Sequence, residues 1–221
     1  MCMARTYKWL GGIGYILGLV PYVSFISSII VAIAWILMGK DTREKIFTVL
    51  GVLMLVMFAS AIALIAWLFF SLMMTAYTVV PGALEPWRMG AAISQVLSQL
   101  WVLITAALVI VGLAIAVFIL DIIAHFRAGK IFDSRWFKAA GWMRIILIIA
   151  LVVSIPLTIF MIISAGPGMF STIPALPDYG AIVSLLLTIL WPMIIVLIVS
   201  LLATIFSVIA FFTIPEEASP A

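Results

Sequence analysis

Asp121 and His125 form the one local carboxylate–imidazole pair in this sequence. Four positions apart, the two side chains share one face of a helix. An aspartate can orient a histidine for proton transfer or metal ligation. His125 is the only histidine, however, and Arg127 follows it closely. The pattern therefore favours ordinary salt bridging at the cytoplasmic end of a helix over a proton-handling or metal role.

A second polar set comprises Ser94, Gln95, Ser98 and Gln99. Gln95 and Gln99 are four residues apart and share a helix face. Because an amide that faces lipid costs free energy, we expect this face to look toward protein or water. Hydrogen bonding between helices is the favoured interpretation, and a polar vestibule for a small solute is the alternative.

Gly14 and Gly18 form a G-x-x-x-G pair in an apolar segment. Small residues at this spacing let two helix backbones approach closely. We interpret the pair as a helix-packing surface within the monomer, with a contact to another subunit as the alternative.

The basic run HFRAGKIFDSRWFKAAGWMR, residues 125–144, alternates cations with aromatic residues. This pattern is typical of a segment that lies on anionic lipid headgroups. A docking surface for a cytoplasmic partner is the alternative.

The elements that must position these residues are membrane helices. Hydrophobic residues make up 67% of the chain and charged residues only 9%, whereas soluble domains have about 25% charged residues. Uninterrupted runs without ionisable side chains exceed the roughly 20 residues that cross a bilayer. The sequence predicts an all-α polytopic bundle, one transmembrane domain over 1–221, with long spans at 46–72, 95–120, 143–165 and 181–213.

The segment 9–39 is too long for a straight span and contains Pro21. Proline removes a backbone donor and disfavours a helical residue before it. A short hairpin, a re-entrant segment and one long kinked helix all fit, and we favour the hairpin.

Loop charges support about six membrane segments. With an even number of crossings before Lys40, ten of the eleven basic residues lie on one side and only Arg88 lies on the other. Because basic loops stay in the cytoplasm, we expect both termini to be cytoplasmic and the protein to be a multi-pass protein of the cell membrane.

The opening LGGIGYILGLVPYVSFISSIIVAIAWILMGK, followed by KDTREKIF, resembles a family of archaeal and bacterial membrane proteins described only as a domain of unknown function. In FRAGKIFDSRWFKAAGWMRIILIIAL, Phe137, Ala140 and Gly141 match that family's Phe-x-x-Ala-Gly step. The stretch around Pro81–Trp87 does not align. The resemblance implies an archaeal cell membrane and carries no activity, cofactor or catalytic residue.

Motifs of enzymes and ion-coupled transporters do not occur, and the central stretches of the long spans, at 47–70, 96–120, 145–164 and 182–209, contain no Asp, Glu, Lys, Arg or His. One cysteine, Cys2, permits neither an intrachain disulfide nor a cysteine zinc site. We therefore predict no catalytic residue, cofactor or metal, and no nucleic-acid partner. The first hypothesis is a non-enzymatic accessory subunit that associates with other membrane subunits or with itself in the lipid bilayer. A channel or facilitator for a small solute and a redox or proton-handling subunit are the alternatives.

Overall fold

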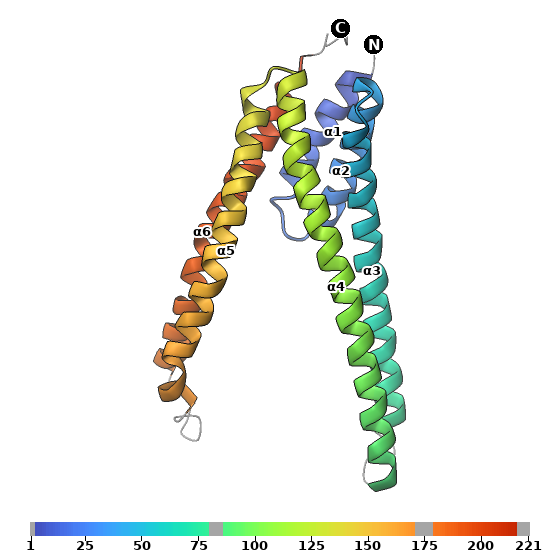
Figure 1. Ribbon diagram of the computed structural model, residues 1–221, viewed down its shortest axis with the longest axis vertical. Coiled ribbons are helices and arrows are strands. Elements are labelled where there is room, and N and C mark those ends of the chain that lie inside the picture. Colours follow the sequence, from blue (N-terminus) through green and yellow to red (C-terminus); the bar gives the residue numbers. More distant parts are fainter. Residues whose placement is uncertain (1–2, 80–85, 171–178, 216–221) are drawn as a thin grey trace.

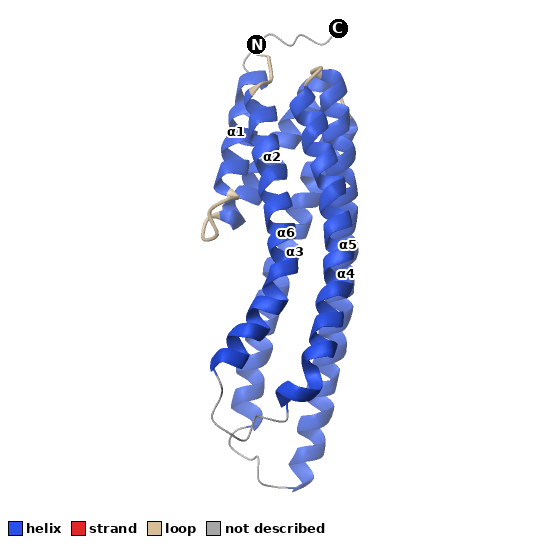
Figure 2. Ribbon diagram, turned by 90° about the vertical axis from the view of Figure 1, so that its left-hand side faces the viewer, coloured by secondary structure: helices blue, strands red, loops and turns tan. Residues whose placement is uncertain are grey.

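The computed structural model describes residues 3–79, 86–170 and 179–215, and its regular structure in these ranges is entirely helical (Figures 1 and 2). The helices are α1 (Met3–Leu17), α2 (Ser24–Thr42), α3 (Lys45–Val79), α4 (Pro86–Ile131), α5 (Arg135–Phe170) and α6 (Tyr179–Phe212). The predicted all-α bundle, with an N-terminal hairpin and four long helices, is confirmed.

The chain turns between α1 and α2 at residues 18–23, around Pro21. Amide groups in the turn still find partners: Leu19 donates to the Ile16 carbonyl and Val23 to the Val20 carbonyl. The Ser24 hydroxyl donates to the Pro21 carbonyl at 2.9 Å. Satisfying these groups is what permits a turn in apolar surroundings. One long kinked helix over 9–39 is therefore wrong.

α1 and α2 lie in contact, and Gly14 of α1 faces that contact. A Cβ atom on Gly14 would lie 2.7 Å from a Val31 methyl group. The Ser27 hydroxyl donates to the Gly14 carbonyl at 2.8 Å, and Ser27 also lies against Gly18. The structure thus places both glycines of the G-x-x-x-G pair in a contact within the monomer.

Successive helices are neighbours, and α1 also lies against α6, so the six helices form a ring at the end that carries both termini (Figure 1). Aromatic side chains fill its centre. The largest fully buried ones are Trp35, Tyr7, Phe47, Phe137 and Phe211. Within the described residues, the ring is therefore a packed core.

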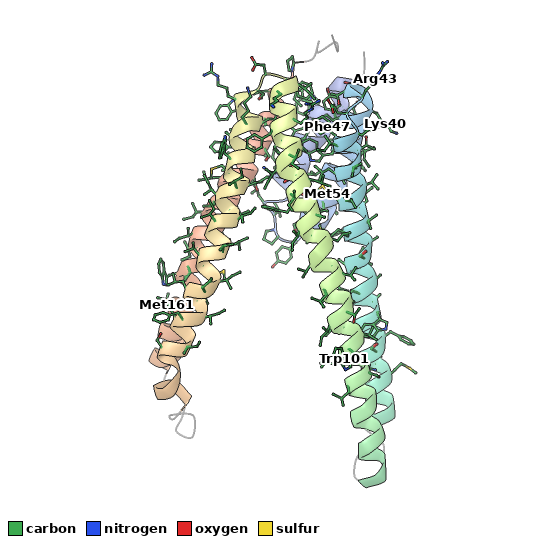
Figure 3. The ribbon with its side chains drawn as sticks, in the orientation of Figure 1. Lys40, Arg43, Phe47, Met54, Trp101 and Met161 are labelled. Atoms are coloured by element: carbon green, nitrogen blue, oxygen red, sulfur yellow. The ribbon has the colours of Figure 1, made fainter. Side chains whose placement is uncertain are left out.

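Away from this end, the α3–α4 pair and the α5–α6 pair diverge (Figures 1 and 3). The α1–α2 hairpin lies only in the upper part of the molecule (Figure 2). Its turn residues Gly18 and Leu19 line a groove with Met193 and Leu197, near the middle of α6. Met193 is 14 residues from the start of α6, so the hairpin stops roughly 20 Å short of that helix's far end.

Segments of α2, α3, α4, α5 and α6 are each long and apolar enough to cross a membrane. The protein is thus a multi-pass integral membrane protein. α1 has 15 residues and a length of roughly 22 Å. The α2–α3 and α4–α5 connections, with their basic residues, lie at the same end as the termini, whereas Arg88 lies in the first turn of α4 at the other end (Figures 1 and 3).

The long helices extend past most of the predicted span boundaries. α4 begins at Pro86 and continues through Asp121 and His125 to Ile131, although 95–120 was the predicted span. The predicted span ends before the first charged residue, whereas helical hydrogen bonding continues beyond it, and the Asp121 side chain there pairs with Arg144 of α5.

Candidate functional site: a buried polar cluster

The Asp121–His125 pair lies inside the bundle rather than at a solvated helix end. His125 is 0% exposed, and the Asp121 side chain is 17% exposed. The His125 Nδ1 atom lies 2.8 Å from the Asp121 carbonyl oxygen and 3.2 Å from its carboxylate Oδ1. Both oxygens are acceptors, so in the neutral ring Nδ1 carries the hydrogen.

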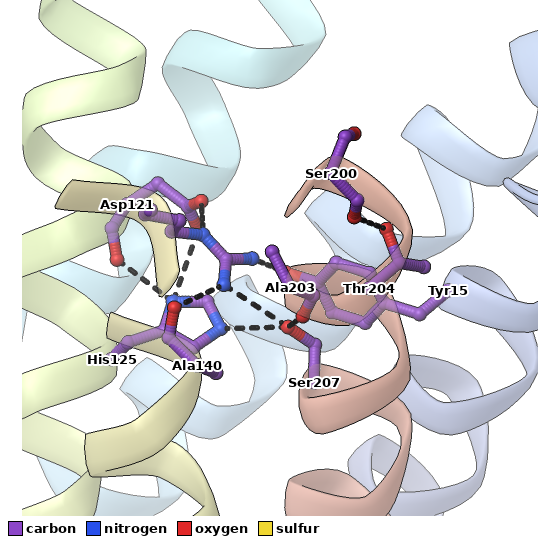
Figure 4. A network of polar contacts seen from close by, with 9 residues as sticks. Tyr15, Asp121, His125, Ala140, Ser200, Ala203, Thr204 and Ser207 are labelled. Atoms are coloured by element: carbon purple, nitrogen blue, oxygen red, sulfur yellow. Dashed lines mark hydrogen bonds and ion pairs between the residues drawn. The ribbon is translucent and has the colours of Figure 1, made fainter. Parts of the chain in front are cut away.

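Arg144 of α5 completes the cluster. Figure 4 shows the groups around it, which include Tyr15, Asp121 and Ser207. Its Nε donates to the Asp121 carboxylate, and the residue is only 6% exposed. One terminal nitrogen donates to the Ala140 carbonyl and to the Ser207 hydroxyl, each at 3.1 Å. The other donates to the Tyr15 hydroxyl at 3.3 Å. One guanidinium thereby links α1, α4, α5 and α6.

Ser207 of α6 lies between the arginine and the histidine. Its hydroxyl donates to the Ala203 carbonyl at 2.8 Å and lies 3.4 Å from His125 Nε2. A serine hydroxyl has a single hydrogen. Since the Ala203 contact is much the shorter, the imidazole Nε2 receives at most a weak hydrogen bond.

Aromatic rings enclose the imidazole on its remaining sides. The His125 ring centre lies 5.1 Å from that of Trp35, 5.9 Å from that of Phe137 and 6.4 Å from that of Tyr15. The Trp35 Nε1 atom is buried and has no hydrogen-bond partner among the described residues. These rings keep water from the imidazole, so proton exchange with solvent would require the helices to move apart.

The sequence interpretation of this pair needs two corrections. Arg127 binds Glu44 of the α2–α3 connection at 2.7 Å and makes no contact with Asp121. The charged partner of Asp121 is Arg144 of α5, so the bundle does bury ionisable groups. One signal could have found it: Asp121 and Arg144 are nearly equidistant from the turn at 132–134, so antiparallel helices bring them level.

The other predicted polar pair lies elsewhere on α4. Gln99 is half-buried, and the side chain of Gln95 lies outside the described residues. Gln99 is 26 positions before His125, roughly 40 Å along the helix. The structure therefore does not bring the two sets together.

The cluster's chemistry is that of a compensated ion pair. Asp121 offsets the charge of Arg144, and hydroxyl and carbonyl groups accept from three further guanidinium N–H groups. Removal of one member of such a buried pair destabilises the folded protein, because the other charge stays buried without compensation. Within 3–79, 86–170 and 179–215, no three His, Cys, Asp or Glu residues come together as metal ligands.

Comparison with protein-family models, curated proteins and solved structures gives no match to this chain.

Proposed function

We propose that the protein is a non-enzymatic subunit of a larger membrane assembly and acts by association. The observation that carries this proposal is the divergence of the two helix pairs. Of the most apolar stretch of α4, only 6% of residues are buried, and of that of α3, only 11%. The parts of α3 and α4 away from the ring thus contact only each other among the described helices and are available to other membrane helices (Figure 1).

A groove between α3 and α4 supports a helix as the occupant. It has a volume of about 370 Å³ and is lined by Ser60, Ala63, Leu64, Trp67, Val102, Ala106, Val109 and Ile110. Association of helices in lipid depends on close van der Waals packing, which small side chains permit. Ser60, Ala63 and Ala106 provide such small side chains in its lining. The proposed occupant is an apolar transmembrane helix of another subunit.

The basic end of the bundle lies in the cytoplasm in this proposal, with both termini inside and the membrane being the cell membrane. The shared position of the termini and the two basic connections supports this orientation. The hairpin then enters from the cytoplasmic side and turns within the bilayer.

The packed aromatic core argues against a pathway for a solute through the ring of helices. A route through the ring would have to displace Trp35 and Phe211, both fully buried. A route along the face of Gln95 and Gln99 would lie outside the ring, and other subunits would have to close it. A facilitator made from one copy therefore has less support than a subunit that associates.

The experiment is purification from the native membrane into nanodiscs without crosslinking, followed by native mass spectrometry. We expect a particle heavier than one 24.1 kDa chain, with a stoichiometric second polypeptide. Ala106→Trp, which fills the groove, should release that polypeptide. Ile149→Trp, at an exposed apolar position of α5, should retain it. A strictly single-copy particle would contradict the proposal, and retention by Ala106→Trp would place the contact elsewhere.

A further inference from the structure

We propose that a pocket beside the α4–α5 turn binds the phosphate of an anionic membrane lipid, with Arg135 as its cation. The pocket has a volume of about 560 Å³ and lies at the basic end of the bundle. It is lined by Phe132, Asp133, Ser134, Arg135, Trp136, Ala139 and Thr213. Its volume is in the range of pockets that hold small ligands.

Three acidic residues at this end are paired with cations other than Arg135. Asp133, the acidic residue of the pocket, holds the Lys138 ammonium at 3.3 Å. Arg127 is held by Glu44 and Arg144 by Asp121. Among the described residues, Arg135 has no acidic partner. A guanidinium binds phosphate oxygens through two parallel hydrogen bonds, which makes Arg135 the group that would recognise the headgroup.

The remaining lining suits a lipid headgroup and the glycerol beneath it. The Ser134 hydroxyl is buried and has no hydrogen-bond partner among the described residues, so it can donate to a phosphate oxygen after a small rotation. Phe132 and Ala139 provide apolar surface. Trp136 is 41% exposed, with its inner face against Phe206. Indole rings in such positions lie at the level of lipid headgroups.

The position of the pocket distinguishes a lipid from a dissolved anion. Exposed apolar side chains continue down α5 from Trp136 of the pocket to Trp142 and Ile146. The bilayer surface therefore reaches the level of Arg135, where lipid phosphates are concentrated and acyl chains can continue down the helix. A lipid adds apolar contact below the pocket that inorganic phosphate does not have.

The full chain in detergent is titrated with phosphatidylglycerol or phosphatidylcholine, and retained lipids are counted by native mass spectrometry. We expect retention of phosphatidylglycerol, and Arg135→Gln should weaken it about ten-fold, the effect of losing one charged hydrogen-bonding partner. Lys130→Gln is the matched control: it removes a cation at the same end of the bundle that does not line the pocket. Circular dichroism verifies that both variants fold.

Three outcomes would overturn the proposal. Equal retention of the two lipids would show that the phosphate charge is not recognised. Equal losses in Arg135→Gln and Lys130→Gln would indicate diffuse attraction by the basic end. Displacement of phosphatidylglycerol by millimolar inorganic phosphate would assign the pocket to a soluble anion.

Discussion

Arg144 is the residue whose environment is most demanding, because a guanidinium in a helical membrane bundle requires an opposite charge and a full set of acceptors. Asp121 provides the charge, and Asp121, Ser207, Tyr15 and the Ala140 carbonyl accept from four of the guanidinium N–H groups. The side chains of Tyr15, Asp121, Arg144 and Ser207 come from α1, α4, α5 and α6. Their contacts therefore hold the ring closed where the helix pairs meet. We therefore assign the cluster a structural role in fixing this end of the bundle.

Asp121→Asn should destabilise the folded protein by about 3–5 kcal/mol, because it leaves the Arg144 charge buried without compensation. The double variant Asp121→Asn/Arg144→Gln should recover part of that loss. Glu44→Gln breaks the more exposed pair with Arg127 and should cost less than about 1 kcal/mol. Denaturant unfolding in detergent measures all three. Equal losses for Asp121→Asn and Glu44→Gln would refute the structural role of the cluster.

At the scale of helices, close backbone contact positions the hairpin against α3. A Cβ atom on Gly51 would lie 2.5 Å from the Ala32 carbonyl oxygen of α2, a backbone atom that cannot rotate away. By contrast, a Cβ atom on Gly112 of α4 would meet no atom within 4 Å. The two glycines have the same conformational preferences, so their difference isolates helix packing.

Gly51→Ala should destabilise the protein by about 1–3 kcal/mol, since α2 and α3 must separate to accept the methyl group. Gly112→Ala should leave stability unchanged or raise it by up to about 1 kcal/mol, because alanine favours the helix. Thermal unfolding in one detergent compares them. If Gly51→Ala were as stable as Gly112→Ala, the close contact of α2 with α3 would be wrong.

The helices themselves could be read from the sequence. Runs without charge predict the four long helices because only apolar side chains tolerate lipid, and Pro21 predicts the break in 9–39 because it lacks an amide hydrogen. The arrangement of the helices could not be predicted. Apolar residues cover every face of α3 to α6, so no stripe distinguishes helix contacts from lipid contacts. Arg144 stands next to a loop in the sequence, and only the packing of α5 against α4 shows that its side chain is buried beside Asp121.

For the whole molecule, the depth of the hairpin decides how many times the chain crosses the membrane. In a Cys2→Ser background, Arg43→Cys should react with a membrane-impermeant maleimide only from the cytoplasmic side, and Arg88→Cys only from the outside. Tyr22→Cys, at the hairpin turn, should react from neither side, because the turn lies level with the middle of α6. Labelling of Tyr22→Cys together with Arg88→Cys would mean that the hairpin crosses completely.

Divergence of the helix pairs is the feature on which the proposed association rests. The distance between two spin labels, attached to cysteines introduced in a Cys2→Ser background, measures this divergence in nanodiscs. One pair, at Ile123 and Ile146, lies near the polar cluster, and the other, at Trp101 and Phe160, lies on the separated parts of α4 and α5; all four side chains are exposed. In each pair the two positions lie within five residues of the same level relative to the α4–α5 turn, so helices packed side by side throughout would give two similar distances. We predict a short distance for the first pair and a much longer one for the second by double electron–electron resonance. Two equally short distances would contradict the open bundle and the proposed mode of association.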